Sequence, residues 1–135
     1  MADAVTSQTL LEGERNVVMK FTNVSDGTGE SAVKKVDVSA LASNSRGIAC
    51  SDVRLSKITY SCVGMSVQVF FDATSNVLAL ELGDGTDGTL DFSDFGGIVN
   101  NAGSGKTGDI DFTTTGHSSG DTYMVILEMI KVYSD

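Results

Sequence analysis

The sequence predicts an all-β protein: a single-domain antiparallel β-sandwich, jelly-roll-like, or a barrel, with an extended N-terminal arm. Three observations support this fold class. Apolar and polar residues alternate with a period of two and β-branched residues are frequent, while no long run shows the 3.6-residue spacing of an amphipathic helix. Clusters of Gly, Asn, Asp and Ser separate eight or nine such short segments, which is typical of sandwiches and barrels. The chain has 135 residues, 41% of them apolar, enough for the core of one domain.

The first half of the chain holds most of the predicted strands, at residues 5–11, 16–24, 32–38, 53–63 and 65–73. Turn-forming residues at Ser25 to Gly29 separate the second segment from the third. Residues 42–52 are polar and are expected to form a loop, with a helical turn near residues 40–43. Gly64 separates the last two segments, which are both strong strand signals.

In the second half, strands are predicted at residues 76–82 and 109–114. Between them, the acidic, glycine-rich stretch 83–97 is expected to interrupt the strands, although Leu90 and Phe92 form a short apolar pair. Ile98 and Val99 are expected to pair only briefly with a neighbouring strand.

The last predicted strand, residues 122–133, is apolar on both faces over residues 124–127, which indicates a central strand. A terminal helix is the competing interpretation, since Met, Leu and Glu favour helices. Recurring Tyr, Val and Ile favour the strand. The domain organisation that follows is an N-terminal arm or edge strand over residues 1–13 and a β-sandwich domain over residues 14–135.

The charge of the chain restricts the classes of partner that it can bind. The net charge is −9 and the pI is near 4.3, so the chain repels phosphate backbones and anionic lipid headgroups. Nucleic acid and membrane are therefore not expected as partners. Acids and bases balance over residues 1–71, whereas residues 72–121 hold nine acids against Lys106 alone. We expect these acids to lie mostly in loops that face solvent.

Two cysteines, Cys50 and Cys62, and one histidine are too few for a zinc site, which needs about four nitrogen or sulfur ligands. The opening residues lack the basic start and continuous apolar core of a secretory signal. Two reduced, buried cysteines are therefore favoured over a disulfide, which the spacing also allows.

Two segments are similar to ligand-binding motifs but depart from them at key positions. Residues 103–107 (GSGKT) are similar to the end of a phosphate-binding loop, but Asn100 stands where the motif requires glycine and a strand follows in place of a helix. Four aspartates could surround a calcium ion, but their spacing differs from that of calcium-binding loops, so a solvated acidic loop is favoured. They are Asp84, Asp87, Asp91 and Asp94.

The remaining candidates for chemistry are also weak. Asp109 and Asp111 lie on one side of their strand and could act as an acid–base pair, but exposed carboxylates are favoured in this polar context. His117 lies in a loop of small polar residues without a recognisable nucleophile, so an exposed loop histidine is expected. Five strand aromatics are interpreted as core or subunit contacts: Tyr60, Phe70, Phe71, Tyr123 and Tyr133. No catalytic, cofactor-binding or metal-binding residue is assigned, and a non-enzyme is expected.

Several stretches of the chain, taken in order, resemble small virion structural proteins of tailed bacteriophages, especially those of marine phages and cyanophages. The stretches are MADAVTSQTLLEGERNVVMKFTNVSDGTGE, KITYSCVGMSVQVFFDAT, LDFSDFGGIVNNAGSGKTGDIDFTT and SGDTYMVILEMIK. The resemblance implies an all-β capsid decoration or cement protein without enzymatic activity or cofactor. It also implies the major capsid protein as partner, a homotrimer, a place on the capsid exterior and synthesis in the host cytoplasm.

Under this hypothesis the N-terminal arm carries the protein-interaction residues Val5, Thr9, Leu10 and Leu11. The arm could add as a strand to the sheet edge of a neighbour, or it could form an edge strand of its own domain. Two alternative functions stay open: a neck, tail or head-fibre component, and a carbohydrate- or cell-surface-binding module. The second is less favoured, since the chain has no Trp for a glycan platform.

Overall fold

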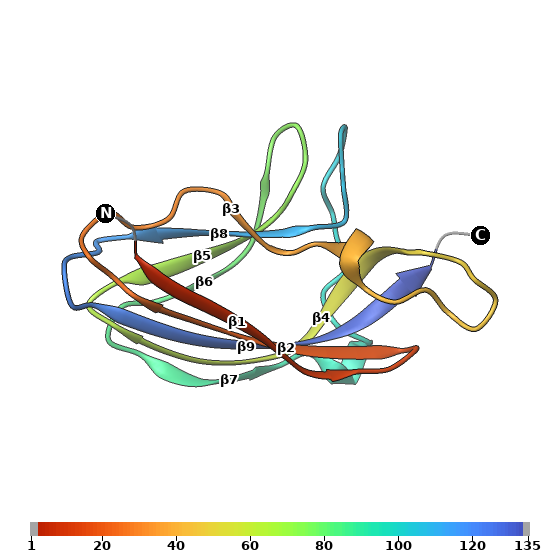
Figure 1. Ribbon diagram of the computed structural model, residues 1–135, viewed down its shortest axis with the longest axis horizontal. Helices are drawn as coiled ribbons and strands as arrows, with labels where there is room; N and C mark the ends of the chain where they lie inside the picture. Colours follow the sequence, from red (N-terminus) through yellow and green to blue (C-terminus); the bar gives the residue numbers. More distant parts are fainter. Residues whose placement is uncertain (1–2, 134–135) are drawn as a thin grey trace.

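Two antiparallel sheets packed face to face make up the computed structural model, which describes residues 3–133 (Figure 1). The five-stranded sheet has the order β1-β2-β9-β4-β7 and the four-stranded sheet the order β3-β8-β5-β6. The strands are β1 (Ala4–Glu12), β2 (Asn16–Val24), β3 (Val33–Val36), β4 (Cys50–Val63), β5 (Ser66–Phe71), β6 (Val77–Leu82), β7 (Asp87–Asp91), β8 (Ile110–Thr115) and β9 (Thr122–Tyr133). Two 3-10 turns complete the elements, η1 (Val38–Ala40) and η2 (Ser93–Phe95). The predicted all-β sandwich is confirmed.

The strand order is that of a jelly roll with one extra strand. From β2 to β9 the chain changes sheet at every connection except the β5–β6 hairpin, which divides eight strands equally between the two sheets. β1 is the ninth strand and pairs only with β2, at the edge of the five-stranded sheet. It therefore has no strand opposite it in the other sheet.

Alternate residues of both sheets point inward and form one apolar core. Phe112 lies near its centre, with its ring edge-to-face against Phe21 at 5.4 Å and against Tyr123 at 5.9 Å between ring centroids. Such edge-to-face pairs are favourable because the positive edge of one ring meets the negative face of the other. The largest fully buried side chains include Phe21, Phe71, Phe112, Leu55, Ile58, Met65, Leu82, Ile110, Leu127 and Met129.

β9 is a central strand, as predicted, because it pairs with β2 on one side and β4 on the other. The competing helix interpretation is wrong. The strand is buried on its inward face and half-buried at every other residue, which explains why apolar residues occupy both faces. Among residues 3–133, no helix has the length and apolar character needed to cross a membrane.

Two differences from the prediction lie between residues 37 and 52. β4 begins at Cys50, so the expected polar loop over residues 42–52 ends early, because the buried Cys50 pairs with Tyr133 of β9. The 3-10 turn η1 precedes the helical turn expected near residues 40–43. Asp37 starts η1 there, since its side chain accepts a hydrogen bond from the Ser39 amide at 3.0 Å.

The acidic, glycine-rich stretch contains a strand that the sequence did not reveal. β7 forms the second edge of the five-stranded sheet, where Leu90 lies opposite Ile58 and packs against the core. Further along, Ile98 pairs with Leu55, which confirms the expected brief pairing. Gly97 permits this close approach: a Cβ there would lie 3.0 Å from the Leu55 carbonyl oxygen.

Candidate interaction surface

β1 is exposed along its whole length. All nine of its residues are exposed, although the strand pairs with β2 from Ala4 opposite Val24 to Glu12 opposite Val17. The cause is topological: the four-stranded sheet ends at β3 and provides no strand to cover β1. Of the two alternatives for the N-terminal segment, the structure has the edge strand.

The four predicted interaction residues lie on β1 but do not share one face. Val5 and Thr9 lie opposite β2 residues that face the four-stranded sheet, whereas Leu11 lies opposite Val18 on the outer face. Leu10 occupies a bulge, where the register shifts. The exposed fractions are 45% for Val5, 46% for Leu10 and 56% for Leu11, so β1 offers apolar contacts in two directions.

β1 also differs from the other sheet edges in charge. Of the four edge strands that the structure describes, β3 carries two lysines, β6 carries Glu81 and β7 carries two aspartates. Charged side chains on an edge discourage pairing with another chain. β1 has no charged residue from Ala4 to Leu11, so this edge lacks that protection.

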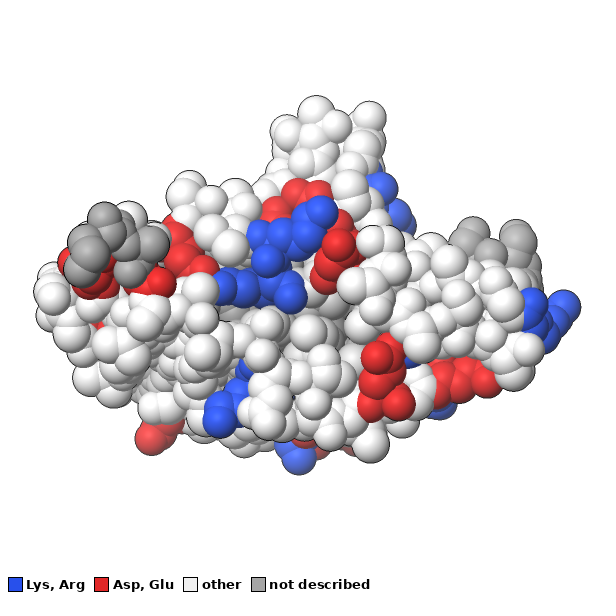
Figure 2. Space-filling view, in the orientation of Figure 1, with Lys and Arg blue, Asp and Glu red and all other residues white. Residues whose placement is uncertain are grey.

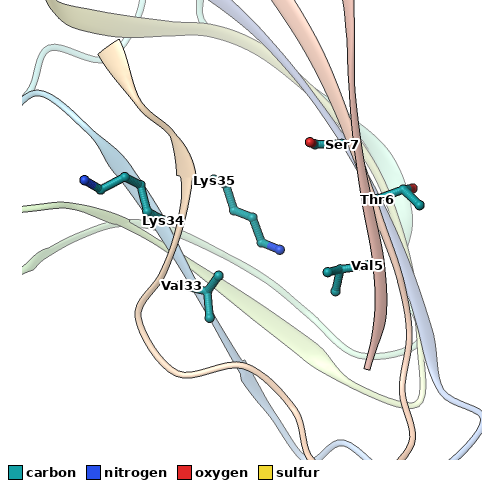
Figure 3. Close-up of a pocket in the computed structure, with 6 residues that line it drawn as sticks. All are labelled: Val5, Thr6, Ser7, Val33, Lys34 and Lys35. Carbon is teal, nitrogen blue, oxygen red and sulfur yellow. The ribbon is translucent and has the colours of Figure 1, made fainter. Parts of the chain in front are cut away.

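A groove of about 220 Å³ separates β1 from β3, the neighbouring edge of the other sheet. Its lining is Val5, Thr6, Ser7, Val33, Lys34 and Lys35. Figure 3 shows Val5 and Ser7 pointing across the groove toward β3, Lys35 pointing toward β1 and Thr6 pointing away. Basic and acidic side chains lie next to one another on this face of the molecule (Figure 2).

A buried polar network borders the groove. Lys35 forms an ion pair with Glu30, and the two side chains are 7% and 5% exposed. Glu30 Oε1 also accepts hydrogen bonds from Asn23 Nδ2 at 3.0 Å and from the Tyr123 hydroxyl at 2.6 Å. Burial, and then the Glu30 carboxylate, raise the pKa of Tyr123, which stays a neutral donor. Lys35 Nζ lies 6.0 Å from the ring centroid of Phe112.

Sequence reasoning missed Glu30 and Lys35 as functional or structural residues. The partners of Glu30 come from distant segments: Tyr123 is 93 positions away. No local pattern marks such a network, and it becomes visible only when the two sheets are brought together.

The N-terminal end of β1 is fastened by Asp3. Its carboxylate accepts hydrogen bonds from Asn23 Nδ2 at 3.1 Å and from the amides of Asp26 and Gly29 at 3.1 and 3.2 Å. Burial alone raises the pKa of Asp3, but these hydrogen bonds outweigh it and lower the pKa to about 2. The carboxylate is therefore ionised at neutral pH and joins the strand to the turn after β2.

The C-terminal end of β1 is fastened by Glu12. Glu12 Oε2 accepts hydrogen bonds from Lys131 Nζ at 2.8 Å and from the Ala42 amide at 2.6 Å. These bonds lower the pKa of Glu12, that from Lys131 most. We call Asp3 and Glu12 the anchoring carboxylates. Because both ends are held, β1 is a fixed part of the sheet.

The predicted exposure of the acidic segment is partly confirmed. The four aspartates considered as a calcium site, Asp84, Asp87, Asp91 and Asp94, are all exposed.

Asp109 and Asp111, in contrast, were expected on the surface and are only 4% and 3% exposed, so that prediction is wrong. Asp109 accepts hydrogen bonds from the Val38 amide at 2.9 Å and from Lys34 Nζ at 3.0 Å. Residues of the adjoining loops contact both aspartates: Asn76 donates to the Asp111 carboxylate at 3.2 Å, and the Asp72 amide donates to the Asp109 carbonyl at 3.0 Å. Within residues 3–133, no three His, Cys, Asp or Glu side chains are grouped to hold a metal ion.

Residues 103–107 form a turn, as predicted, and Lys106 is an exposed residue whose ammonium group lies 3.5 Å from Asp52. His117 is half-buried rather than exposed, because its ring packs on Gly29 and its Nδ1 lies 3.2 Å from Thr114 Oγ1.

Both cysteines are free and buried, which confirms the prediction of reduced thiols. Burial raises the pKa of Cys50, and it raises the pKa of Cys62 to about 11. Both side chains are therefore neutral thiols at neutral pH.

No family model matches the chain, and no curated protein matches it. Among solved structures, a cupin superfamily protein from Desulfitobacterium hafniense is similar over 98% of this chain and 81% of that chain, with 12% identity and a TM-score of 0.36. The fold class rests on the sheet topology of this chain. The topology defines an all-β sandwich of the jelly-roll type with an added edge strand, which carries no charge from Ala4 to Leu11.

Proposed function

We propose that this chain is a non-enzymatic structural protein of a phage particle, which decorates the capsid and binds its neighbour through β1. The observation that carries the proposal is the edge of β1: all nine residues are exposed, and the eight from Ala4 to Leu11 carry no charge. An open edge strand presents unpaired N–H and C=O groups that another chain can pair with. The sequence resemblance to small virion proteins supports the same function.

Side chains on β1 would add to the main-chain pairing. Val5, Leu10 and Leu11 are each about half exposed, and burying them against a partner removes apolar surface from water. The anchoring carboxylates hold β1 in its own sheet, so in this proposal the partner supplies the incoming strand. Binding to the assembled shell then stabilises that shell in proportion to affinity and concentration.

The major capsid protein is the proposed partner, with three copies of this chain around a three-fold position on the capsid exterior. The exposed acidic loops suit that side, since negative charge neither attracts nor holds the packaged genome. A neck, tail or head-fibre position is the alternative, and the copy number per particle separates the two. Hundreds of copies are expected for a decoration protein and about a dozen or fewer for a neck or tail part.

The test compares binding to shells that lack this chain. In the variant Thr9→Lys/Leu10→Lys, two lysines interrupt the uncharged edge, and we expect at least a tenfold loss of affinity for the shell. Thr89→Lys is the matched control, because Thr89 is exposed on β7, the opposite edge of the same sheet. The control is expected to bind like the wild type.

Heat release of DNA gives the second measurement. Particles that carry the chain are expected to hold their DNA to a higher temperature than particles without it. Equal heat resistance of the two would refute a cement role, and equal shell binding by the β1 variant and the wild type would refute the assignment of β1.

A further inference from the structure

Two loops project together from the outer face of the four-stranded sheet (Figure 1). Backbone hydrogen bonds join them, from the Thr74 amide to the Ser104 carbonyl at 3.2 Å and from the Thr107 amide to the Asp72 carbonyl at 3.2 Å. Gly105 allows the contact, because a Cβ there would collide with Thr74. We call them the paired loops, residues 72–76 and 101–109.

A buried carboxyl lies beneath the paired loops. Asp111 of β8 is 3% exposed, and its Oδ2 accepts a hydrogen bond from Asn76 Nδ2 at 3.2 Å. Its Oδ1 is buried and receives a hydrogen bond from no donor in the described residues. Asp111 lies opposite Phe70 in the β5–β8 pairing, so Asp72, two residues after Phe70 at the base of the first loop, follows on the same face, and the two carboxyls interact. Burial and the nearby like charge both favour a proton on one of the two carboxyls.

The charged groups around the two carboxyls come from the neighbouring strands and loops. Asp72 follows β5, Asp109 precedes β8 and Lys34 comes from β3, whose register places it opposite Asp111. Lys34 Nζ is 3.0 Å from Asp109, and its side chain is 51% exposed. Lys34 also interacts with Asp37 and Asp72, and Lys106 of the second loop pairs with Asp52. One partly solvated cation is therefore shared among several carboxyl groups, and none of its direct bonds goes to the buried Asp111.

The titration of the pair agrees with this geometry. Burial, and then the neighbouring Asp72, raise the pKa of Asp111 to about 7. A hydrogen bond from Thr107 Oγ1 at 2.7 Å lowers the pKa of Asp72, which therefore stays ionised. Two carboxyls whose environments separate their pKa values share one proton in this way.

We propose that a proton shared by Asp111 and Asp72 latches the paired loops onto the four-stranded sheet, and that its loss to water releases them. Once Asp111 is ionised, the two carboxylates repel each other at close range in a poorly hydrated site. Asp72 is the group that moves, because it is half-buried on a loop whereas Asp111 lies within β8. Movement of Asp72 breaks its bonds to Thr107 and separates the two loops. This inference does not depend on the proposed capsid function.

The direction of the pH effect follows from the sign of the shift. Between the ordinary aspartate pKa of 3.8 and about 7, the folded chain binds more protons than the unfolded chain. The contribution of Asp111 to stability is therefore complete below about pH 4, falls as the pH rises toward 7 and is lost above it.

Amide hydrogen exchange of the full chain tests the latch directly. Protection of the Thr74 and Thr107 amides is measured at pH 5.5 and pH 8.5, in EDTA and after correction for the intrinsic exchange rate. We expect at least a tenfold loss of protection at the higher pH. The Gly120 amide, bonded to the Ser25 carbonyl at 2.8 Å in a different loop, is expected to keep its protection.

Variants identify the group responsible. In Asp111→Asn, the amide donates to Asp72 at every pH, so protection of the paired loops is expected to become independent of pH. Asp87→Asn, the same change at an exposed aspartate, is expected to keep the wild-type profile. If Asp111→Asn does not fold, Asp72→Asn replaces it; because an uncharged amide does not repel the ionised Asp111, protection of the paired loops is again expected to become independent of pH. The proposal is wrong if wild-type protection is equal at both pH values or if neither variant changes the profile.

Discussion

Lys131 donates a hydrogen bond to Glu12 at 2.8 Å across 119 positions of sequence, and the lysine side chain is completely buried. Lys131 belongs to the central strand β9, whereas Glu12 ends the edge strand β1. The pair therefore joins the most buried strand of the five-stranded sheet to the most exposed one.

Removal of the Glu12 carboxylate is expected to destabilise the protein. In Glu12→Ala, Lys131 stays buried and keeps only the Ala42 carbonyl, 3.3 Å away, as a partner. We expect a loss of about 1–3 kcal/mol in the free energy of unfolding, less than for a fully buried pair because Glu12 is 28% exposed. Urea denaturation at pH 7 measures the loss. Glu81→Ala, at an exposed position on the edge strand β6, serves as the control, and equal losses in the two variants would contradict the prediction.

Acid is expected to weaken the attachment of β1. The folded-state pKa values of both anchoring carboxylates lie below the ordinary values, that of Asp3 at about 2. Their contribution to stability is present above about pH 4.5 and is lost as the pH falls through the lowered pKa values. The thermal midpoint is expected to fall between pH 4.5 and 2, and by less in the double variant Asp3→Asn/Glu12→Gln. If the double variant keeps the full acid sensitivity of the wild type, other groups are responsible for that sensitivity.

Breaking the buried Glu30–Lys35 ion pair beside the groove is expected to lower the free energy of unfolding more than breaking any surface ion pair. Glu30→Gln leaves Lys35 as a buried cation without its counter-charge, and removal of one partner of such a pair costs about 3–5 kcal/mol. Chemical denaturation measures the effect, with Glu81→Gln as the matched exposed control. Lys35→Met combined with Glu30→Gln is expected to cost less than the sum of the single changes, because neither variant group is then a buried charge. Strict additivity would show that the two residues do not depend on each other.

Neither thiol is expected to react in the folded protein. With the pKa of Cys62 raised to about 11, roughly one molecule in a thousand carries the thiolate at pH 8, and burial restricts access further. A thiol reagent should label no cysteine in the native state within minutes and two in urea. Val99→Cys, at a position that is 57% exposed, is the reactive control. Fast labelling of the native wild type would show that the core opens readily.

Two glycines with the same backbone requirement are expected to respond differently to substitution. Gly47 and Gly108 both have positive φ, 78° and 87°. A Cβ at Gly47 meets no atom within 4 Å, whereas one at Gly108 would collide with the Ser51 carbonyl oxygen. Gly47→Ala is therefore expected to cost about 1–2 kcal/mol for the left-handed conformation alone, and Gly108→Ala clearly more. Equal thermal midpoints of the two variants would contradict the close contact.

Strands with a clear alternation could be predicted from the sequence, and those without one could not. β9 was identified with its correct bounds because Tyr, Val and Ile recur over a long segment. β7 was missed because aspartate and glycine disfavour strands, and only its pairing with β4 makes it one. Strand propensity is a property of a single segment, whereas the pairing that makes the segment a strand also depends on the strand next to it.

The polar residues were harder to place than the strands. The alternation of Asp109 and Asp111 correctly places both on one side of the chain, but it does not show that loops cover that side. The anchoring carboxylates and the Glu30–Lys35 pair likewise depend on contacts between distant segments. The predicted interaction residues, in contrast, were found on an exposed strand, since an N-terminal segment outside an eight-strand jelly roll has nothing to cover it.

Attachment of β1 at both ends has a consequence for the thermodynamics of association. A flexible arm that becomes ordered on binding loses conformational entropy worth about 1–2 kcal/mol for each residue that is fixed. The anchoring carboxylates already fix β1, so that loss is part of folding and does not recur when a partner docks. In an association through this edge, the ordering penalty falls on the incoming strand alone, and this chain acts as a preorganised template.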